Sequence, residues 1–204
     1  MVKSKNLAVI PYITVGLAAC SLNTIELSYS DQQKLDFVEN AFISTLNSSA
    51  QECMKSSPLE IVEYVMTPGM LYSPGRFHPK TQTRKISEKN FYENNYVNIQ
   101  IHESIHQLDI VCGLLDRNAF IIAYNQMDSD EFPIKDKVKS TRRISRDAER
   151  IADFIHIWLT NQYEVPKSVK VIFSSIFRDV NSLTGSFSDI NKLEEKLEQP
   201  MSKN

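Results

Sequence analysis

The sequence predicts an α+β fold that is mostly helical, with a small β-element near its middle. Apolar residues recur at helical spacing along most of the chain. The exception is residues 70–91, where Pro-Gly and His-Pro-Lys-Thr turns separate short β-prone segments. Hydrophobic residues make up 42% of the 204 residues and charged residues 24%, which is ordinary for one folded domain.

Residues 1–19 have the layout of a secretory signal peptide, with two lysines before an apolar stretch that ends in small residues. The end of this stretch, Leu-Ala-Ala-Cys at 17–20, resembles the lipobox of bacterial lipoproteins. That resemblance implies cleavage before Cys20 and lipidation of its thiol. We therefore expect an exported protein that is anchored to a membrane surface in the bacterial envelope without spanning the membrane. Ser21 would favour the outer membrane in a Gram-negative host. The alternative is an ordinary secretory signal with a chance cysteine, and hence a secreted protein.

The remaining chain is predicted to be a tether at residues 20–30, one domain at 31–198 and a loose tail at 199–204. Cys53 and Cys112 are the only other cysteines. Export permits a disulfide between them. Two cysteines alone leave open whether it forms.

Two helices are expected before the β-element. Ser30 begins a capping-box pattern, which predicts a helix over about 31–47, or as far as 54. Ser57 followed by Pro58 predicts a second helix that ends before Pro68.

The β-element is predicted to be a hairpin with strands near 75–78 and 83–87. Asn94 or Asn95 then caps a helix that ends at Gly113. The predicted buried stripe of this helix consists of Val97, Ile101, Ile105, Leu108 and Cys112.

Further helices are expected along the second half of the chain, on either side of a polar connection at 126–145. They are predicted at 114–125, at about 146–161, from Pro166 as far as Val180, and at 188–198.

The helix that Asn94 or Asn95 caps carries His102-Glu103-Ser104-Ile105-His106, which fits the H-E-x-x-H pattern. Residues four apart on a helix lie one turn apart on the same face. Both imidazoles can therefore reach one tetrahedral zinc ion, and Glu103 beside them can take a proton from water. The alternative is a helix that carries two histidines by chance.

A hydrolytic zinc site needs a third protein ligand, and the helix at 146–161 offers one. Glu149 and Asp153 lie on one face of that helix. We expect Glu149 to bind the ion and Asp153 to orient one histidine, with Asp109 as another candidate for that second role. His156 lies on a similar face and is a candidate for contacting the substrate, or else a packed core residue.

H-E-x-x-H followed by E-x-x-x-D is the pattern of gluzincin zinc peptidases. The segments HESIHQLDIVCGLLDRN and AERIADFIHIWL resemble the catalytic domain of anthrax lethal factor and the related Pro-Pro endopeptidases. This resemblance covers about residues 75–182 and implies a zincin-like domain with one zinc ion per chain. It also implies that His102, His106 and Glu149 are the ligands and that Glu103 is the catalytic base.

The sequence departs from that family at one position. The family has a tyrosine seven residues before the ligand glutamate, where it steadies the oxyanion, and this chain has Arg142 there. Arg142 is the first candidate for that role. Tyr124, Tyr163 and His156 are the alternatives. The basic run from Lys135 to Arg146 either faces the cleft and favours acidic substrates or is a solvated loop.

We therefore expect a zinc-dependent endopeptidase that acts on a peptide or protein. A catalytically inactive zinc-binding envelope lipoprotein is the first alternative, and a structural envelope protein with a chance motif is the second. The net charge of −2 gives no argument for a nucleic-acid partner.

Overall fold

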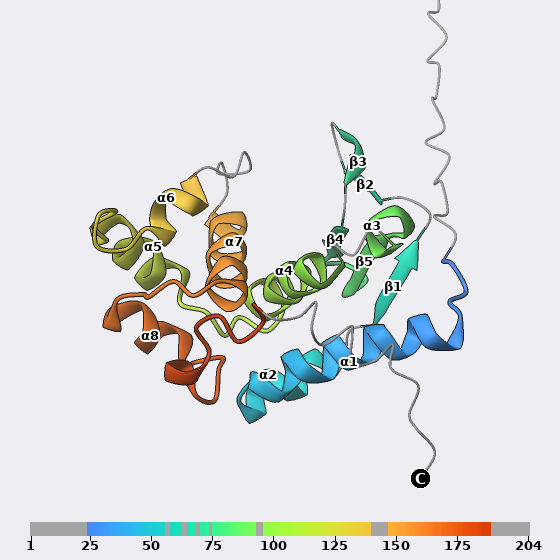
Figure 1. The fold of residues 1–204 in the computed structure, drawn as a ribbon, viewed down its shortest axis with the longest axis horizontal. Coiled ribbons are helices and arrows are strands. Elements are labelled where there is room, and N and C mark those ends of the chain that lie inside the picture. The colour runs from blue at the N-terminus through green and yellow to red at the C-terminus, as the bar shows by residue number, and fades with distance from the viewer. Residues whose placement is uncertain are drawn as a thin grey trace, which may run out of the picture.

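Helices form most of the chain, and a small sheet precedes the helix that carries the two histidines, as predicted (Figure 1). The computed structural model describes residues 24–55, 58–62, 65–67, 70–73, 75–92, 96–139 and 147–188. In chain order the elements are α1 (Tyr29–Thr45), α2 (Ser48–Met54), β1 (Leu59–Val62), β2 (Val65–Thr67), β3 (Met70–Ser73), β4 (Gly75–His78), β5 (Thr83–Ser87), α3 (Glu88–Tyr92), α4 (Tyr96–Ile110), α5 (Arg117–Gln126), α6 (Ile134–Lys139), α7 (Asp147–Thr160), α8 (Lys167–Phe173) and the 3₁₀ turn η1 (Val180–Ser182).

Helix α4 lies between the two halves of the fold. In Figure 1 the sheet, α1 and α3 are on one side of it, and α5, α6, α7 and α8 are on the other. As a result every α4 residue from Tyr96 to Asp109 is buried except Asn98, which is partly buried. Polar side chains on such a helix need protein partners, because water cannot supply them.

The main sheet has three strands in the order β1-β5-β4. β4 and β5 form the predicted hairpin, antiparallel from Gly75↔Ile86 to His78↔Thr83. β1 runs parallel to β5 on the other side. β4 is therefore the edge strand next to α4 among the strands that the structure describes.

The helix predicted from Ser57 to Pro68 is wrong, because this part of the chain forms strands β1 and β2. The β-branched and aromatic residues between Pro58 and Pro68 also favour a strand. Pairing with β5 buries Ile61 and Val62, and this long-range contact outweighs the local Ser-Pro helix signal.

The tether predicted at residues 20–30 is wrong from Thr24 onward, because this segment pairs with β1 and then enters α1. Thr24 forms a β-bridge with Val62, and the Ile25 N–H donates to the carbonyl of Ile61 at 2.9 Å. Ser28, and not Ser30, caps α1 by accepting a hydrogen bond from the Asp31 N–H. Cys20 and the predicted signal peptide lie outside the described residues. None of the helices that the structure describes is long and apolar enough to cross a membrane.

The first helical region ends at Thr45, close to the predicted end at about residue 47, and breaks there instead of continuing to residue 54. The side chain of Asn47 accepts a hydrogen bond from the Ala50 N–H and so begins α2. The break lets Leu46 bridge to Phe177 and become fully buried.

In the second half, the helix predicted at 146–161 is confirmed as α7. α5 starts later than predicted because Asp116 caps it, and α6 lies within the predicted polar connection, where Ile134 and Val138 are buried. α8 ends at Phe173, and turns continue the segment that was predicted as one long helix. The predicted helix at 188–198 lies outside the described residues, apart from Ser188, which is in a turn.

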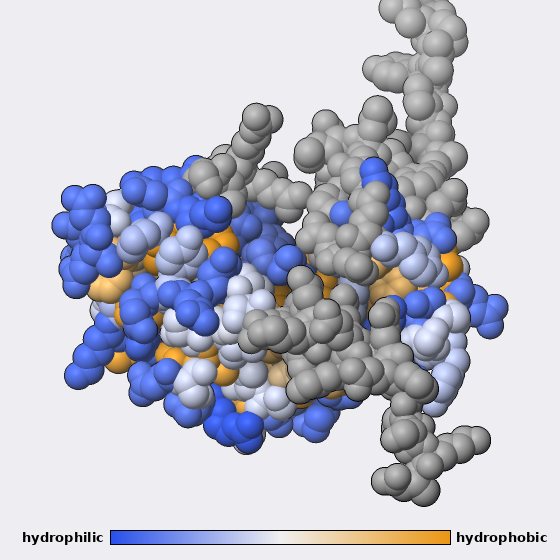
Figure 2. Space-filling model, viewed as in Figure 1, coloured by the Kyte–Doolittle hydropathy of each residue, from blue (hydrophilic) through white to orange (hydrophobic). Residues whose placement is uncertain are grey.

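Among the coloured residues in Figure 2, hydrophilic side chains predominate, with smaller hydrophobic areas between them. The largest apolar side chains are inside. Among them are Trp158, Phe120, Phe154, Phe173 and Phe177, which are fully or almost fully buried and contact one another in edge, stacked or tilted arrangements. This aromatic core supports α7 from the side that faces away from the sheet.

Cys53 and Cys112 form a disulfide, which settles the question that the sequence leaves open. Cys53 lies in α2 and Cys112 just beyond the end of α4, and the bond spans 59 residues. It therefore ties the histidine helix to the N-terminal helices.

We predict that replacing both cysteines by alanine lowers the free energy of unfolding by about 4 kcal/mol, because a crosslink over a loop of this length limits the unfolded chain. Denaturant titration of the oxidised wild type and the double variant measures the difference. A reducing agent should lower the stability of the wild type and leave the variant unchanged. Equal stabilities of the two oxidised proteins would contradict the prediction.

Candidate metal centre

Helix α4 presents the two histidines to one point. His102 and His106 are buried, and their Nε2 atoms lie 3.1 Å apart. This follows from their four-residue spacing, which places both rings on the side of α4 that faces α7.

Helix α7 brings a carboxylate to the same point. Oε2 of Glu149, in the first turn of α7, lies 3.4 Å from Nε2 of His102 and 3.5 Å from Nε2 of His106. Donor atoms bound to one tetrahedral zinc ion at its usual bond length are about 3.3 Å apart. The three side chains therefore fit a zinc ion with little movement, and Glu149 is where the sequence places the third ligand.

Asp153 lies one turn after Glu149 and contacts the other side of the His102 ring. Its Oδ1 is 3.2 Å from Nδ1 of His102. A carboxylate in this position accepts a hydrogen bond from the Nδ1–H group, which leaves Nε2 as the ligand nitrogen. Asp153 thus occupies the position that the orienting role requires.

The charges of this group depend on one another. Burial alone would lower the pKa of His102, but hydrogen bonds to Asp153 and Glu149 outweigh it and raise the pKa to about 9. A hydrogen bond from His102 has the largest effect on the pKa of Glu149, followed by one from His106. Together they hold that pKa well below its usual range. Without a metal ion the group is therefore a positively charged imidazolium held by carboxylates.

A metal ion must displace the His102 proton, so metal affinity should rise with pH. In the metal-free protein the contribution of His102 to stability is complete below its unfolded pKa of about 6.5 and is lost as the pH rises through about 9. Glu149 contributes above its unfolded pKa of about 4.5, and that contribution is lost in acid.

We therefore expect zinc affinity to increase by about tenfold per pH unit between pH 7 and 9, with about one proton released per ion at pH 7. Calorimetry in two buffers with different heats of ionisation measures the released protons. An affinity that stays constant over this range would contradict the prediction.

Glu103 lies beside the two histidines on α4 and is buried. Burial raises the pKa of its carboxyl group, and the charges of the histidines partly offset this. The Phe77 N–H of β4 donates a hydrogen bond to the carboxylate. β4 comes this close because of Gly75, where a Cβ atom would lie only 2.2 Å from Cγ2 of Ile99 and 3.3 Å from Cγ of Glu103.

The opposite side of α4 is held by an ion pair between a buried arginine and a partly buried glutamate, which sequence reasoning missed. Arg84 of β5 donates two hydrogen bonds of 2.7 Å to Glu39 of α1 and one of 2.8 Å to Ser104 of α4. Gln100 of α4 also donates to Glu39, at 2.8 Å. This network fixes α4 against α1 and the sheet, while the histidines face α7. Nothing in the local pattern around Arg84 indicates it.

His156 lies close to His102, with the ring centroids 6.3 Å apart, but its nearest polar partner is a residue that the sequence did not suggest. Nε2 of His156 is 3.2 Å from Oδ1 of Asn98, which is one turn before His102 on α4. Burial lowers the pKa of His156 to about 4, so the ring is neutral at pH 7. The four-residue spacing of Asn98, His102 and His106 is the signal that could have found Asn98.

Other predicted site residues lie elsewhere. Oδ1 of Asp109 accepts a hydrogen bond of 2.7 Å from Nε of Arg117, so α5 engages this carboxylate. The Tyr124 hydroxyl donates a hydrogen bond to the carbonyl of Lys135, between α5 and α6. Tyr163 follows the far end of α7, and that end lies about 16 Å along the helix axis from Glu149. Arg142 lies outside the described residues.

Comparison with known proteins identifies no relative. No family model matches the chain, and no match is found among curated proteins or among solved structures. The resemblance to lethal factor therefore stays a prediction, and the functional argument depends on the geometry of the site.

Proposed function

We propose that the protein is a zinc-dependent endopeptidase. The observation that carries this proposal is the convergence of His102 Nε2, His106 Nε2 and Glu149 Oε2, at separations of 3.1, 3.4 and 3.5 Å, beside the buried Glu103 carboxyl group. Two imidazoles and one carboxylate are a donor set of hydrolytic zinc enzymes. A zinc ion held by these residues would supply a Lewis acid that polarises a carbonyl group and makes water more acidic.

The residues around this point have distinct tasks in such a reaction. A Glu103 carboxylate oxygen accepts a proton from the attacking water and passes it to the leaving amine nitrogen. The raised pKa of Glu103 suits this role, because a general base works best when its pKa approaches the working pH. The Phe77 N–H holds the carboxylate in position, and Asp153 keeps His102 oriented.

The edge strand supports an extended peptide or protein segment as the substrate. β4 lies at the edge of the three-stranded sheet and contacts α4 next to Glu103. A peptide that adds a strand beside β4 would pass the catalytic base, with backbone hydrogen bonds supplying affinity.

The layout of residues 1–20 supports export and lipidation at Cys20, which would hold this enzyme on a membrane surface of the bacterial envelope.

The test combines metal analysis with peptide cleavage. The purified protein should contain one zinc ion per chain and cleave members of a varied peptide library. A chelator should abolish the cleavage, and added zinc should restore it. Absence of stoichiometric zinc, even after resupply, would reject the proposal and leave HESIH as a helix that carries two histidines.

A catalytically inactive zinc-binding lipoprotein is the second candidate. Arg142 stands where the resembling family has its oxyanion tyrosine, and the Tyr124 hydroxyl is engaged by Lys135. This candidate predicts stoichiometric zinc without cleavage of any peptide, including proline-rich ones. Any cleavage that depends on Glu103 rejects it.

A further inference from the structure

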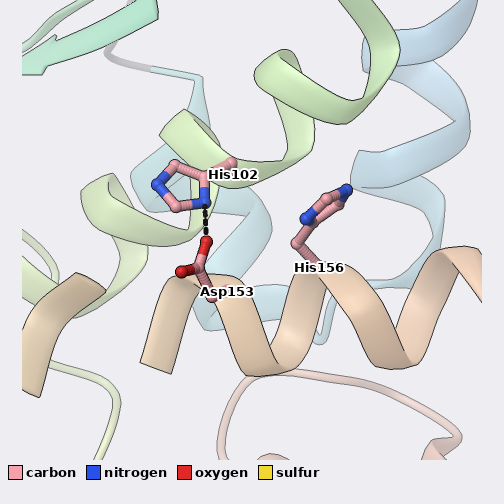
Figure 3. Close-up of side chains that lie close together, drawn as sticks. All are labelled: His102, Asp153 and His156. Atoms are coloured by element: carbon pink, nitrogen blue, oxygen red, sulfur yellow. Dashed lines mark ion pairs between the residues drawn. The ribbon is translucent and has the colours of Figure 1, made fainter. Parts of the chain in front are cut away.

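A second set of metal-binding side chains adjoins the first. His102, Asp153 and His156 each offer one ligand atom, and these atoms all lie within 4.8 Å of one another. Figure 3 shows Asp153 and His156 on α7, with Asp153 paired to the His102 ring of α4. His102 belongs to both sets, since Nε2 faces Glu149 and Nδ1 faces Asp153. Its ring lies between two candidate metal positions.

The contact with Asn98 fixes the His156 tautomer and leaves one ring nitrogen that can bind a metal ion. An amide oxygen accepts hydrogen bonds, so the 3.2 Å contact with Asn98 Oδ1 places the proton of His156 on Nε2. Nδ1 is then the nitrogen with a free electron pair. The Asp153 carboxylate has the corresponding effect on His102. It accepts a hydrogen bond from Nδ1, so there the proton is on Nδ1 and Nε2 has the free electron pair.

The three donor groups determine which kind of metal ion this position can bind. Two imidazoles and a carboxylate suit Zn²⁺ and similar divalent transition metals, whereas Mg²⁺ and Ca²⁺ prefer oxygen ligands. The 4.8 Å limit is wider than the separation of about 3.3 Å in a closed tetrahedral zinc site. The three donor atoms are thus less tightly gathered than a closed site guarantees, and binding also requires the loss of the His102 Nδ1 proton to solvent, which makes this position weaker than the first.

We propose that His102, Asp153 and His156 form a second, weaker site for a divalent transition-metal ion, with His102 shared between the two ions. The effect of this second ion on peptidase activity rests on the proposed function. An ion at this position takes Asp153 away from its role of orienting His102, so excess zinc should lower peptidase activity.

Zinc titration of the metal-free full chain by calorimetry tests the second site directly. The wild type should bind two equivalents in a tight and a weak step. His156→Gln should lose only the weak step, and Asn98→Ala should weaken that step by about tenfold because the His156 tautomer is no longer held. His78→Gln is the matched control, and it should keep both steps. Thermal unfolding of each metal-free variant confirms that it folds.

The outcomes separate this inference from the proposed function. Glu149→Ala should lose the tight step and keep the weak one. A wild type that shows the tight step alone, a weak step that persists in His156→Gln, or a weak step that His78→Gln also removes would overturn the second site. A wild type that lacks only the tight step would overturn the proposed function and leave the second site standing.

Discussion

Replacement of Glu149 by alanine is expected to remove the metal ion from the tight site and to abolish peptide cleavage. Glu149 Oε2 is the carboxylate donor within 3.5 Å of both Nε2 atoms, so the variant keeps two of three ligands. Loss of a group behind a metal ligand already costs 10–100-fold in affinity, and loss of the ligand itself should cost more than about 100-fold. Zinc per chain, measured by mass spectrometry after dialysis, reports the result.

Asp147→Asn is the matched control for this experiment. Asp147 lies in the same first turn of α7 but is exposed and paired with Arg150, so its removal should leave the zinc content unchanged. A full zinc site in Glu149→Ala would move the third ligand elsewhere, with Asp153 and His156 as the residues to test next.

Glu103→Gln is expected to keep one zinc ion and to lower kcat for peptide cleavage by about 10²–10⁴-fold. Glutamine has nearly the same shape and can still accept the hydrogen bond from the Phe77 N–H, but it cannot take a proton from water. The change therefore removes the general base and leaves the three metal ligands in place. Zinc content and cleavage rate must be measured on the same preparation.

Glu52→Gln serves as the control, because Glu52 is an exposed glutamate of α2 that pairs with Lys55. It should retain the full rate. Normal cleavage by Glu103→Gln would refute the mechanism, even if zinc is present.

The parts of the site that the sequence predicts correctly are those within single helices. Four-residue spacing places His102 and His106 on one face of α4, and Glu149 and Asp153 on one face of α7. The hairpin of β4 and β5 is also local, since its turn lies between the two strands. The failures are of another kind. Residues 59–62 have local signals for a helix and form a strand because β5 pairs with them, and Ser28 replaces Ser30 as the cap.

The sequence by itself therefore determined the helices that carry the ligands and the side of each helix on which the ligands lie, because a helix turn relates nearby residues. Only the tertiary structure decided that α7 faces α4, so that Asp153 contacts His102 while Asp109 pairs with Arg117. It also decided the contact between His156 and Asn98, and the burial of Arg84 against Glu39. These pairs join distant parts of the chain, and their partners are selected by packing, which no local pattern specifies.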